Sequence, residues 1–252
     1  MTQILAVANQ KGGVGKTTTA INVGAALAAL ERRVLLVDCD PQGNATRGLG
    51  ADASPPHLYH VLADGIPAAD AIRPSGFPNL DLLPADRDLV GVEVEFVGDE
   101  GWERRLGDAL APVAGRYDAV LLDCPPSLGH LTVAALTAAD GVLVPLQCEY
   151  YALEGVSELV TTVRRVQASL NPRLQIHGVL LTMYDDRTNL SRDVADEIRR
   201  HFADKVFEAV IPRNVRLAEA PSHGMPVLQY DIRCRGAEAY LAAAREMLRR
   251  AA

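Results

Sequence analysis

The stretch Asn9-Gln10-Lys11-Gly12-Gly13-Val14-Gly15-Lys16-Thr17-Thr18 carries most of what this sequence says about fold and chemistry. It follows an apolar run, 4–8, and precedes a helix-like segment, 17–30. A glycine-rich loop between a strand and a helix can wrap phosphates, because its backbone N–H groups converge on anionic oxygens beside the positive end of the helix dipole. The pattern therefore predicts a phosphate-binding loop.

The side chains of this loop suit a nucleotide with a metal ion. Lys16 is expected to reach the β- and γ-phosphates, and the Thr17 hydroxyl to ligate Mg²⁺. The usual loop of this kind has glycine at the place of Gln10; here a second lysine, Lys11, stands at the mouth of the loop instead. The backbone is expected to bend at three glycines, Gly12, Gly13 and Gly15.

Length and composition favour a folded protein in a reducing compartment. The 252 residues are 48% hydrophobic, which excludes an intrinsically disordered class. No apolar run approaches the ~20 residues that span a bilayer, and the first strand follows the N-terminus without a signal segment, so we expect a cytoplasmic location. The four cysteines lack C-x-x-C spacing and are expected to act as small buried hydrophobic residues.

Charge is distributed unevenly along the chain. The net charge is −7, but residues 1–150 hold 10 basic and 19 acidic residues, whereas residues 151–252 hold 15 and 13. All but one of the basic residues in the second part are arginines. Such arginines can contact phosphates despite an acidic whole, or they can pair with nearby carboxylates; charge alone leaves both readings open.

Apolar runs alternate with helix-like stretches along the whole chain, which predicts an α/β fold. Continuous Val/Leu/Ile runs such as 34–37 and 119–122 are typical of strands covered on both faces, so we expect a single-domain (1–252), mostly parallel, doubly wound sheet with helices on both faces. The expected strands are 3–9, 34–39, 80–84, 118–124, 141–147, 176–183 and 206–212. The expected helices are 17–30, 102–114, 130–138, 153–169, 190–202 and 236–250, with loops near 50–56 and 73–78 around a short helix.

Carboxylates follow two further predicted strands, at the edge where ligands of open α/β sheets bind. Asp38 and Asp40 come at the end of one strand, and Asp123 ends another. Phosphoryl transfer to water needs a metal, charge neutralisation and an oriented water. Asp123 suits a Mg²⁺-bound water, Asp38 suits support of the metal's outer shell, and Asp40 suits orientation or deprotonation of the attacking water.

At these motifs the sequence resembles the ParA/Soj/MinD family of dimeric ATPases with a deviant Walker A loop, K-G-G-x-G-K-T-T. The resemblance to ParA and Soj runs the whole length of the chain. The matching segments are 11–18, 40–46, 123–127, 149–155 (Glu149-Tyr150-Tyr151-Ala152-Leu153-Glu154-Gly155), 181–185 and 211–222.

The resemblance implies ATP/ADP and Mg²⁺ as cofactors and ATP hydrolysis as the activity, with Lys11, Lys16 and Asp40 as catalytic residues. It implies that Lys11 reaches the nucleotide of a partner subunit, so that ATP becomes part of a homodimer interface. It also implies adenine contacts from Pro212 and Asn214. The implied nucleotide-contacting set is Lys11, Gly12, Gly13, Val14, Gly15, Lys16, Thr17, Thr18, Met183, Pro212 and Asn214.

Arg187 and Arg216 match family arginines linked to DNA binding. The resemblance therefore implies an ATP-dependent dimer that binds double-stranded DNA of the nucleoid without sequence preference, and a ParB/Spo0J-type centromere-binding partner that stimulates hydrolysis. The cargo, chromosome or plasmid, stays open. One departure is Met225, which stands where the family often has lysine.

Three other readings compete. A nitrogenase iron-protein-like reductase would need two cysteines placed to hold a cluster between subunits, and the cysteines here are wrongly placed. A MinD-like membrane-associated positioning ATPase would end in a basic amphipathic tail, whereas this chain ends inside its last expected helix, so no membrane contact is expected. A non-hydrolysing nucleotide-binding scaffold is disfavoured by Lys11 together with Asp40.

Overall fold

The computed structural model describes residues 2–149 and 152–250, so Tyr150 and Tyr151 of the 149–155 motif lie outside the described residues. Its centre is a seven-stranded sheet in the order β3-β4-β2-β5-β1-β6-β7, parallel except for the pairing of β3 with β4. The strands are β1 (Gln3–Val7), β2 (Val34–Asp38), β3 (Arg73–Pro74), β4 (Leu80–Leu83), β5 (Ala119–Asp123), β6 (Gly141–Gln147) and β7 (Gln175–Thr182).

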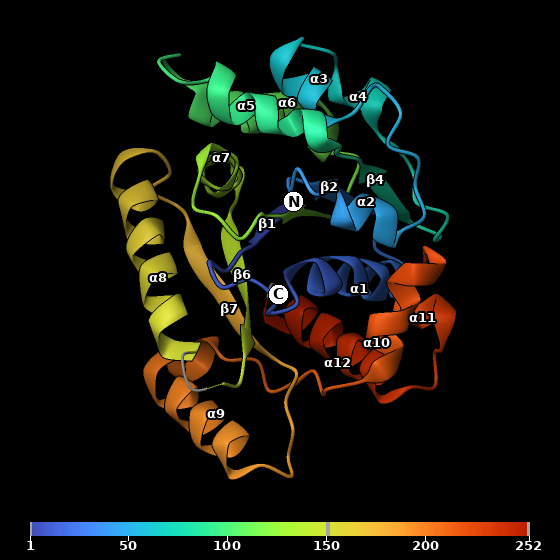
Figure 1. The fold of residues 1–252 in the computed structure, drawn as a ribbon, viewed down its shortest axis with the longest axis vertical. Coiled ribbons are helices and arrows are strands. Elements are labelled where there is room, and N and C mark those ends of the chain that lie inside the picture. Colours follow the sequence, from blue (N-terminus) through green and yellow to red (C-terminus); the bar gives the residue numbers. More distant parts are fainter. Residues whose placement is uncertain (1, 150–151, 251–252) are drawn as a thin grey trace.

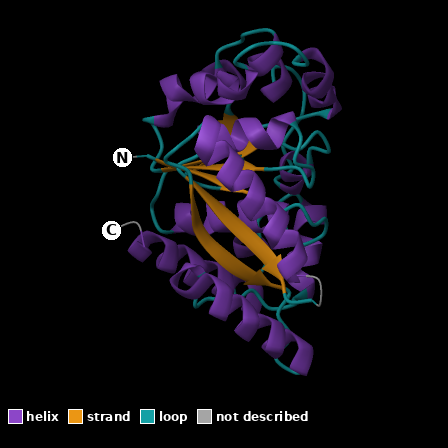
Figure 2. Cartoon of the chain, turned by 90° about the vertical axis from the view of Figure 1, so that its left-hand side faces the viewer, coloured by secondary structure: helices purple, strands orange, loops and turns teal. Residues whose placement is uncertain are grey.

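Helices cover both faces of this sheet (Figures 1 and 2). The α-helices are α1 (Lys16–Ala29), α2 (Asn44–Gly48), α3 (Leu58–Ala63), α4 (Ala68–Ala71), α5 (Val90–Glu95), α6 (Arg105–Ala114), α7 (His130–Ala138), α8 (Ala152–Ser169), α9 (Asn189–Phe202), α10 (Val215–Glu219), α11 (Val227–Tyr230) and α12 (Arg235–Arg250). Short 3₁₀ turns are η1 (Arg87–Leu89), η2 (Trp102–Arg104), η3 (Ala203–Lys205) and η4 (Ala220–His223).

Alternation along each strand divides the core into two layers. On β2, Val34 and Leu36 pack with α1 and α12, whereas Leu35 and Val37 pack on the opposite face with α3, α6 and α7. Successive side chains of a strand point to opposite faces, and every residue of β2 is buried, so the apolar run of the sequence corresponds to a strand covered on both sides. The predicted fold class is confirmed.

The register of the sheet brings the three predicted strand ends together. Strand β5 lies between β2 and β1, and its last residue, Asp123, is opposite Asp38 of β2 and Val7 of β1. The loop after β1 therefore begins beside both carboxylates. Parallel strands place their carboxyl ends at one edge, so segments far apart in sequence converge there.

The prediction of a strand over 206–212 is wrong. This segment makes only isolated bridges to the sheet, between Val206 and Val179 and between Pro212 and Tyr184. Between them, the backbone N–H groups of residues 208 and 209 donate to the Glu246 carboxylate of α12, at 2.9 and 3.0 Å. A side chain thus satisfies groups that a continuous strand would pair with backbone.

The region around 50–78 also differs from expectation. It holds two short helices, α3 and α4, where one was expected, and Arg73 and Pro74 form the antiparallel edge strand β3 inside a predicted loop. The other expected helices and strands agree with the structure to within two residues at each end, with residues 102–114 divided between η2 and α6.

Gly178 of β7 sets the position of the 206–212 segment. A Cβ at this glycine would lie 2.3 Å from Cε2 of Phe207, whose ring also lies 4.3 Å below the Arg250 guanidinium. We expect Gly178→Ala to lower the free energy of unfolding by about 1–3 kcal/mol, because the buried ring must move. Urea unfolding measures this. Gly115→Ala is the control, since nothing lies within 4 Å of that Cβ; equal losses in the two variants would contradict the explanation.

Candidate nucleotide site

The loop after β1 turns through two left-handed glycines. Gly13 has φ 75° and Gly15 has φ 87°, a region that costs other residues strain, and α1 begins directly afterwards at Lys16. The loop is fixed to β7 because the Thr182 hydroxyl donates a 2.8 Å hydrogen bond to the Val14 carbonyl. The first-turn N–H groups of α1 therefore open at the carboxyl edge of the sheet, as an anion site requires.

Lys16 folds back over this loop. Its Nζ donates a hydrogen bond to the Lys11 carbonyl at 3.2 Å, and the residue is 7% exposed. Burial lowers the pKa of Lys16, while the nearby carboxylates of Asp123 and Asp40 act in the opposite direction. The ammonium group is thus placed at the loop's centre, beside the carboxylates, where phosphate oxygens would meet it.

Lys11 is held away from Lys16 by a different set of contacts. Its backbone N–H donates to the Asn9 carboxamide at 3.1 Å, and Asn9 in turn donates to the Pro145 carbonyl. The Lys11 ammonium forms a 3.0 Å ion pair with Glu149, whose other oxygen accepts from Gln147. This ion pair is partly exposed, so Lys11 is free to exchange it for another anion.

Asp38 has a full set of hydrogen bonds although it is entirely buried. Its carboxylate accepts from the Thr46 N–H at 2.8 Å, the Thr46 hydroxyl at 2.7 Å and the Asp40 N–H at 3.2 Å. Burial raises the pKa of Asp38 to about 6, and these hydrogen bonds oppose the rise. Asp38 thereby ties β2 to the first residues of α2.

Asp123 is different, because neither of its buried carboxylate oxygens has a hydrogen-bond partner among the described residues. Burial, followed by the Asp38 charge, raises the pKa of Asp123 well above its usual range, and the nearby Thr17 hydroxyl opposes the rise. Buried polar groups without partners are rare in native proteins. A buried carboxylate with open acceptors beside a threonine hydroxyl fits the outer shell of a hydrated Mg²⁺ ion, which keeps several of its waters.

A hollow of about 290 Å³ lies in front of these groups. It is lined by Gly12, Gly13, Gly15, Lys16, Thr17, Thr18, Asp40, Asn44, Pro126 and Met183. Asp40 is 6% exposed, and one of its oxygens accepts from the Gln42 N–H at 2.9 Å. The structure thus places Asp40 at the same hollow as the phosphate-binding loop, together with Asn44, which the sequence reasoning did not single out.

A second hollow of about 200 Å³ shares part of this wall. It is lined by Gly15, Thr18, Thr182, Met183, Ile211, Pro212, Arg213, Asn214, Leu217, Ala218 and Tyr240. Met183, Pro212 and Asn214 are thus brought together beside the loop, although Asn214 uses its side-chain oxygen to cap α10. The sequence reasoning missed Thr182 and Tyr240 as lining residues. Thr182 could have been found, because it directly precedes Met183, whereas the position of Tyr240 depends on the packing of α12 on α1.

The two arginines expected to bind DNA are both paired with carboxylates. Arg187 forms two 2.8 Å hydrogen bonds with Asp185, and its side chain is 82% exposed. Arg216 lies 2.8 Å from Glu219 and 3.4 Å from Asp231. Exposed ion pairs of this kind contribute little to stability, so each guanidinium can exchange its carboxylate for a phosphate.

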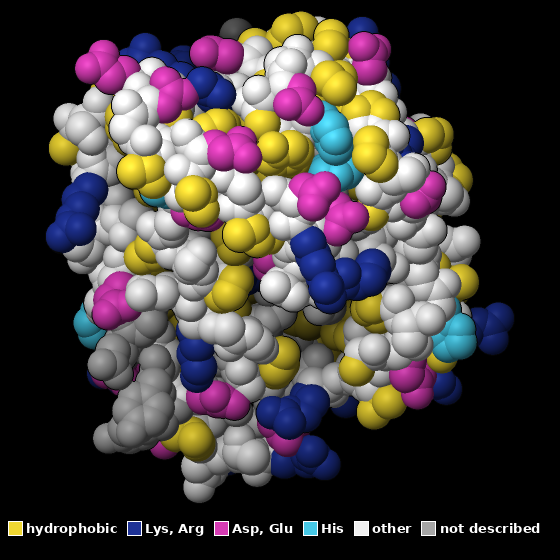
Figure 3. All heavy atoms as spheres, turned by 45° about the horizontal axis from the view of Figure 1, so that its top comes forward, with side chains coloured by type: hydrophobic (Ala, Val, Ile, Leu, Met, Phe, Trp, Pro, Cys, Tyr) yellow, Lys and Arg dark blue, Asp and Glu magenta, His cyan; other side chains and the backbone are white. Residues whose placement is uncertain are grey.

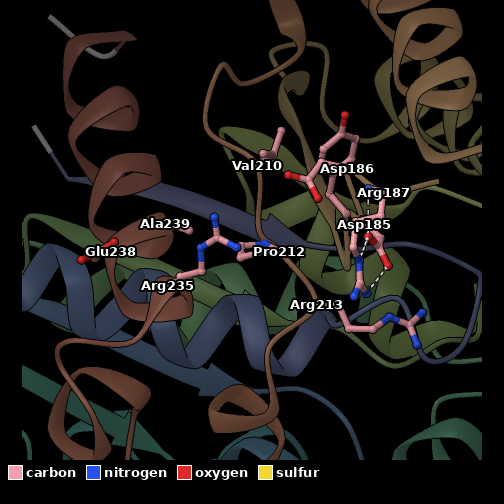
Figure 4. Close-up of a pocket in the computed structure, with 10 residues that line it drawn as sticks. Asp185, Asp186, Arg187, Val210, Pro212, Arg213, Arg235, Glu238 and Ala239 are labelled. Atoms are coloured by element: carbon pink, nitrogen blue, oxygen red, sulfur yellow. Dashed lines mark hydrogen bonds and ion pairs between the residues drawn. The ribbon is translucent and has the colours of Figure 1, made fainter. Parts of the chain in front are cut away.

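Arg187 also lines a third hollow, of about 640 Å³, which Figure 4 shows. Arg213 and Arg235 line it too, from the segment before α10 and from the first residue of α12, and no ion pair is recorded for either within the described part of the chain. Sequence reasoning missed both, although the arginine-rich second part of the chain had pointed to this half of the molecule. Arg216 does not line this hollow.

The fold and the site define a P-loop nucleotide-binding domain, and comparisons with known proteins agree. A family model described as an AAA domain matches residues 2–176. The chromosome partitioning protein ParA of Caulobacter vibrioides is 57% identical over 252 residues, covering 98% of this chain and 94% of that protein. The sporulation initiation inhibitor protein Soj of Bacillus subtilis is 55% identical over 249 residues, covering 98% of each. The chain belongs to the ParA/Soj family of chromosome-partitioning ATPases.

Solved structures agree with this assignment. A cobyrinic acid a,c-diamide synthase from Mycobacterium smegmatis with bound ADP and magnesium has a TM-score of 0.86 and 43% identity, covering 99% of this chain and 95% of that one. The cell division ATPase MinD of Pyrococcus furiosus has a TM-score of 0.82 and 27% identity, covering 99% of each. In the described residues of this chain, no helix has the length and apolar character that crossing a membrane requires.

Replacement of Asp123 tests whether its buried carboxylate charge destabilises the protein when no nucleotide is bound. The native pKa of Asp123 lies above its unfolded value of 3.8, so stability falls as pH rises from about 4 toward the native pKa. We expect Asp123→Asn, without nucleotide, to raise Tm by about 2–4 °C near pH 8, with a smaller gain near pH 5. Scanning calorimetry over this pH range checks it.

Asp38→Asn is the matched variant. It should gain less than Asp123→Asn, because an amide cannot accept all the hydrogen bonds that Thr46 and Asp40 donate to the Asp38 carboxylate. A pH-independent effect of Asp123→Asn, or a larger gain from Asp38→Asn, would contradict the assignment of an unrelieved charge to Asp123.

Proposed function

We propose that this chain is an ATP-hydrolysing DNA-partitioning protein, whose ATP-bound form is a dimer that binds DNA without sequence preference. The observation that carries the proposal is the convergence of three groups at one edge of the sheet: the phosphate-binding loop, the Met183–Pro212–Asn214 hollow and the Asp38/Asp40/Asp123 carboxylates. Membership of the ParA/Soj family and the magnesium nucleotides bound by structural neighbours support it.

In this proposal the two adjoining hollows hold the two ends of ATP. The β- and γ-phosphates lie against the loop N–H groups, Lys16 and Thr17, and the adenine lies between Met183, Pro212 and Asn214. Gly15, Thr18 and Met183 line both hollows, so the two hollows adjoin one another. Thr17, with Asp123 and Asp38 behind it, would hold Mg²⁺, which supplies charge neutralisation at the phosphates.

Asp40 is the group in this site suited to act on water. It lines the phosphate hollow, and one oxygen is held by the Gln42 N–H, which fixes the direction of the other. A carboxylate so fixed can accept a hydrogen bond from a water in line with the γ-phosphate. Asp38 and Asp123 are fully buried behind the hollow, so we assign orientation or deprotonation of the water to Asp40.

Lys11 serves the dimer in this proposal. It lies at the outer side of the loop and is held by Glu149, while Lys16 occupies the inner side. A lysine at the mouth of the site can supply charge to the phosphates of a second subunit, as an arginine finger does. ATP then stabilises the dimer, and the dimer completes the catalytic site.

The DNA part of the proposal rests on exposed arginines of the second part of the chain. Arg187 and Arg216 contact phosphates in place of their present carboxylate partners, and the dimer presents two such sets to one duplex. A ParB/Spo0J-type centromere-binding partner stimulates hydrolysis and thereby release from the nucleoid.

Lys16→Ala and Asp40→Ala separate nucleotide binding from hydrolysis. Loss of the Lys16 charge at the phosphates should reduce ATP affinity by a hundredfold or more, about 3 kcal/mol, whereas Asp40→Ala should bind ATP normally and release no phosphate. Titration with a fluorescent ATP analogue and a phosphate-release assay measure the two effects. Lys205→Ala, at the only other lysine besides Lys11, is the control. An equal loss of ATP affinity in Lys16→Ala and Asp40→Ala would refute this division of roles.

Dimerisation should require ATP and Lys11. Asp40→Ala with ATP and Mg²⁺ is expected to sediment as a dimer, because hydrolysis no longer ends the interaction, and as a monomer with ADP. Lys11→Ala added to this variant should return it to monomer, since the charge facing the partner's phosphates is lost. Analytical ultracentrifugation distinguishes these states. A dimer that persists without Lys11, or that forms equally with ADP, would overturn the proposed interface.

DNA binding should follow the charge of the two arginines and not the DNA sequence. Arg187→Ala and Arg216→Ala should each weaken DNA binding by the ATP-bound dimer, and by the same factor on two unrelated duplexes. Each should also reduce the slope of log affinity against log salt by about one unit. Fluorescence anisotropy over a salt series measures this. Arg116→Ala, an exposed arginine between α6 and β5, is the control. Wild-type affinity in the Arg187/Arg216 double variant would exclude this surface.

A further inference from the structure

Three large apolar side chains are exposed close together on α5 and the residue pair that follows it. Val90 is 52% exposed, Val94 71% and Val97 69%. The spacing of four and then three residues places them on one side of a helical turn. Val92 and Phe96, on the opposite side, are buried in the core. The helix therefore uses one apolar side for packing and leaves a second apolar side in solvent.

The segment that carries these valines is rich in acidic residues, and its basic residues are Arg87, Arg104 and Arg105. The acidic residues of this segment are Asp86, Asp88, Glu93, Glu95, Asp99, Glu100 and Glu103. Within the described residues, ion pairs are recorded only for Asp99, with Arg105, and for Glu93, with His130. Figure 3 shows hydrophobic and acidic side chains intermingled on this face of the molecule, with some basic side chains among them. We name Val90, Val94 and Val97, with the flanking Asp88, Glu95, Glu100 and Glu103, the α5 surface.

The inner side of α5 is firmly attached to α7. The Glu93 carboxylate accepts from the backbone N–H of His130 at 3.0 Å and of Leu131 at 3.3 Å, and it lies 2.8 Å from His130 Nδ1. The Trp102 ring lies edge-on to His130 at 4.5 Å. The chain that enters α7 comes from Asp123 through Pro126, which lines the phosphate hollow. The α5 surface is thus held in place by α7, and the segment that leads into α7 lines the phosphate hollow.

The charge of the α5 surface selects what can cover it. A second copy docked through the same face would place like charges opposite one another, and anionic lipid or nucleic acid would be repelled by the same carboxylates. A positively charged segment gains from each carboxylate for which no ion pair is recorded among the described residues. Apolar side chains at helical spacing on that segment would bury the three valines, as in helix-in-groove recognition.

We propose that the α5 surface is a docking site for a basic peptide segment with helically spaced apolar side chains, contributed by a partner protein. Val90, Val94 and Val97 bury the apolar side of the segment, and Asp88, Glu95, Glu100 and Glu103 pair with its lysines or arginines. This proposal depends on the proposed function in one respect: the partner that contributes the segment would be the protein that stimulates ATP hydrolysis.

The test uses the full chain and a synthetic probe, a fluorescein-labelled peptide of about 18 residues built from leucine and lysine, with leucines at helical spacing and one replaced by a photo-reactive leucine. Fluorescence anisotropy in ADP measures binding, and mass spectrometry locates the cross-links. We expect cross-links within residues 86–103 and weaker binding at higher salt. Val94→Ser/Val97→Ser should weaken binding about tenfold, and Glu100→Gln/Glu103→Gln should flatten its salt dependence.

Ile232→Ser is the matched control, because Ile232 is 60% exposed but lies between α11 and α12; it should bind as wild type. Wild-type affinity in Val94→Ser/Val97→Ser, cross-links elsewhere, or equal binding of a scrambled peptide of the same composition would overturn the proposal. A change in sedimentation of the unliganded protein on Val94→Ser/Val97→Ser would show instead that a second copy covers this face. Peptide binding in the presence of ADP does not depend on ATP hydrolysis. The test therefore gives a valid result even if the protein proves to have no ATPase activity.

Discussion

Two carboxylates buried side by side at the carboxyl edge of the sheet impose the main constraint on this structure. Asp38 and Asp123 are opposite one another on β2 and β5, both without solvent exposure, and the Lys16 ammonium lies close enough to Asp123 for the two charges to interact. Charge removed from water in this way is unfavourable unless it is paired. Under the proposed function, Mg²⁺ would bring the missing positive charge, held by Thr17 beside the phosphate-binding loop.

The two buried carboxylates differ in their hydrogen bonds, and this difference suits them to different roles. Asp38 is satisfied by Thr46 and Asp40, so it holds the segment that presents Asp40 to the phosphate hollow. Asp123 has open acceptors, and burial raises its pKa. Asp38 thus supports the segment that carries Asp40, whereas Asp123 keeps acceptors that a metal-bound water could use under the proposed function.

The far side of the nucleotide site depends on a segment that is not a strand. Glu246 of α12 takes the N–H groups of residues 208 and 209, and Phe207 fills the space left by Gly178, so the chain reaches Pro212 and Asn214 with a fixed geometry. The same α12 contributes Tyr240 to the hollow and Arg235 to the neighbouring arginine-lined one. Packing of the last helix on α1 therefore shapes both the nucleotide site and the surface where phosphates would bind.

Much of this protein could be predicted from its sequence, because local signals and tertiary structure agree. The glycines and lysines of residues 11–18 can only serve a turn between strand and helix, and continuous apolar runs require strands covered on both faces. The alignment of Asp38, Asp40 and Asp123 follows from parallel topology. The sequence could not determine that 206–212 would leave the sheet, since that depends on Glu246 from forty residues away. Nor could it determine that, among the described residues, Arg187 and Arg216 have ion-pair partners and Arg213 and Arg235 have none, or that Asp123 lacks the hydrogen bonds that Asp38 has. Those properties depend on which side chains meet across the fold, and a linear pattern does not record such distances.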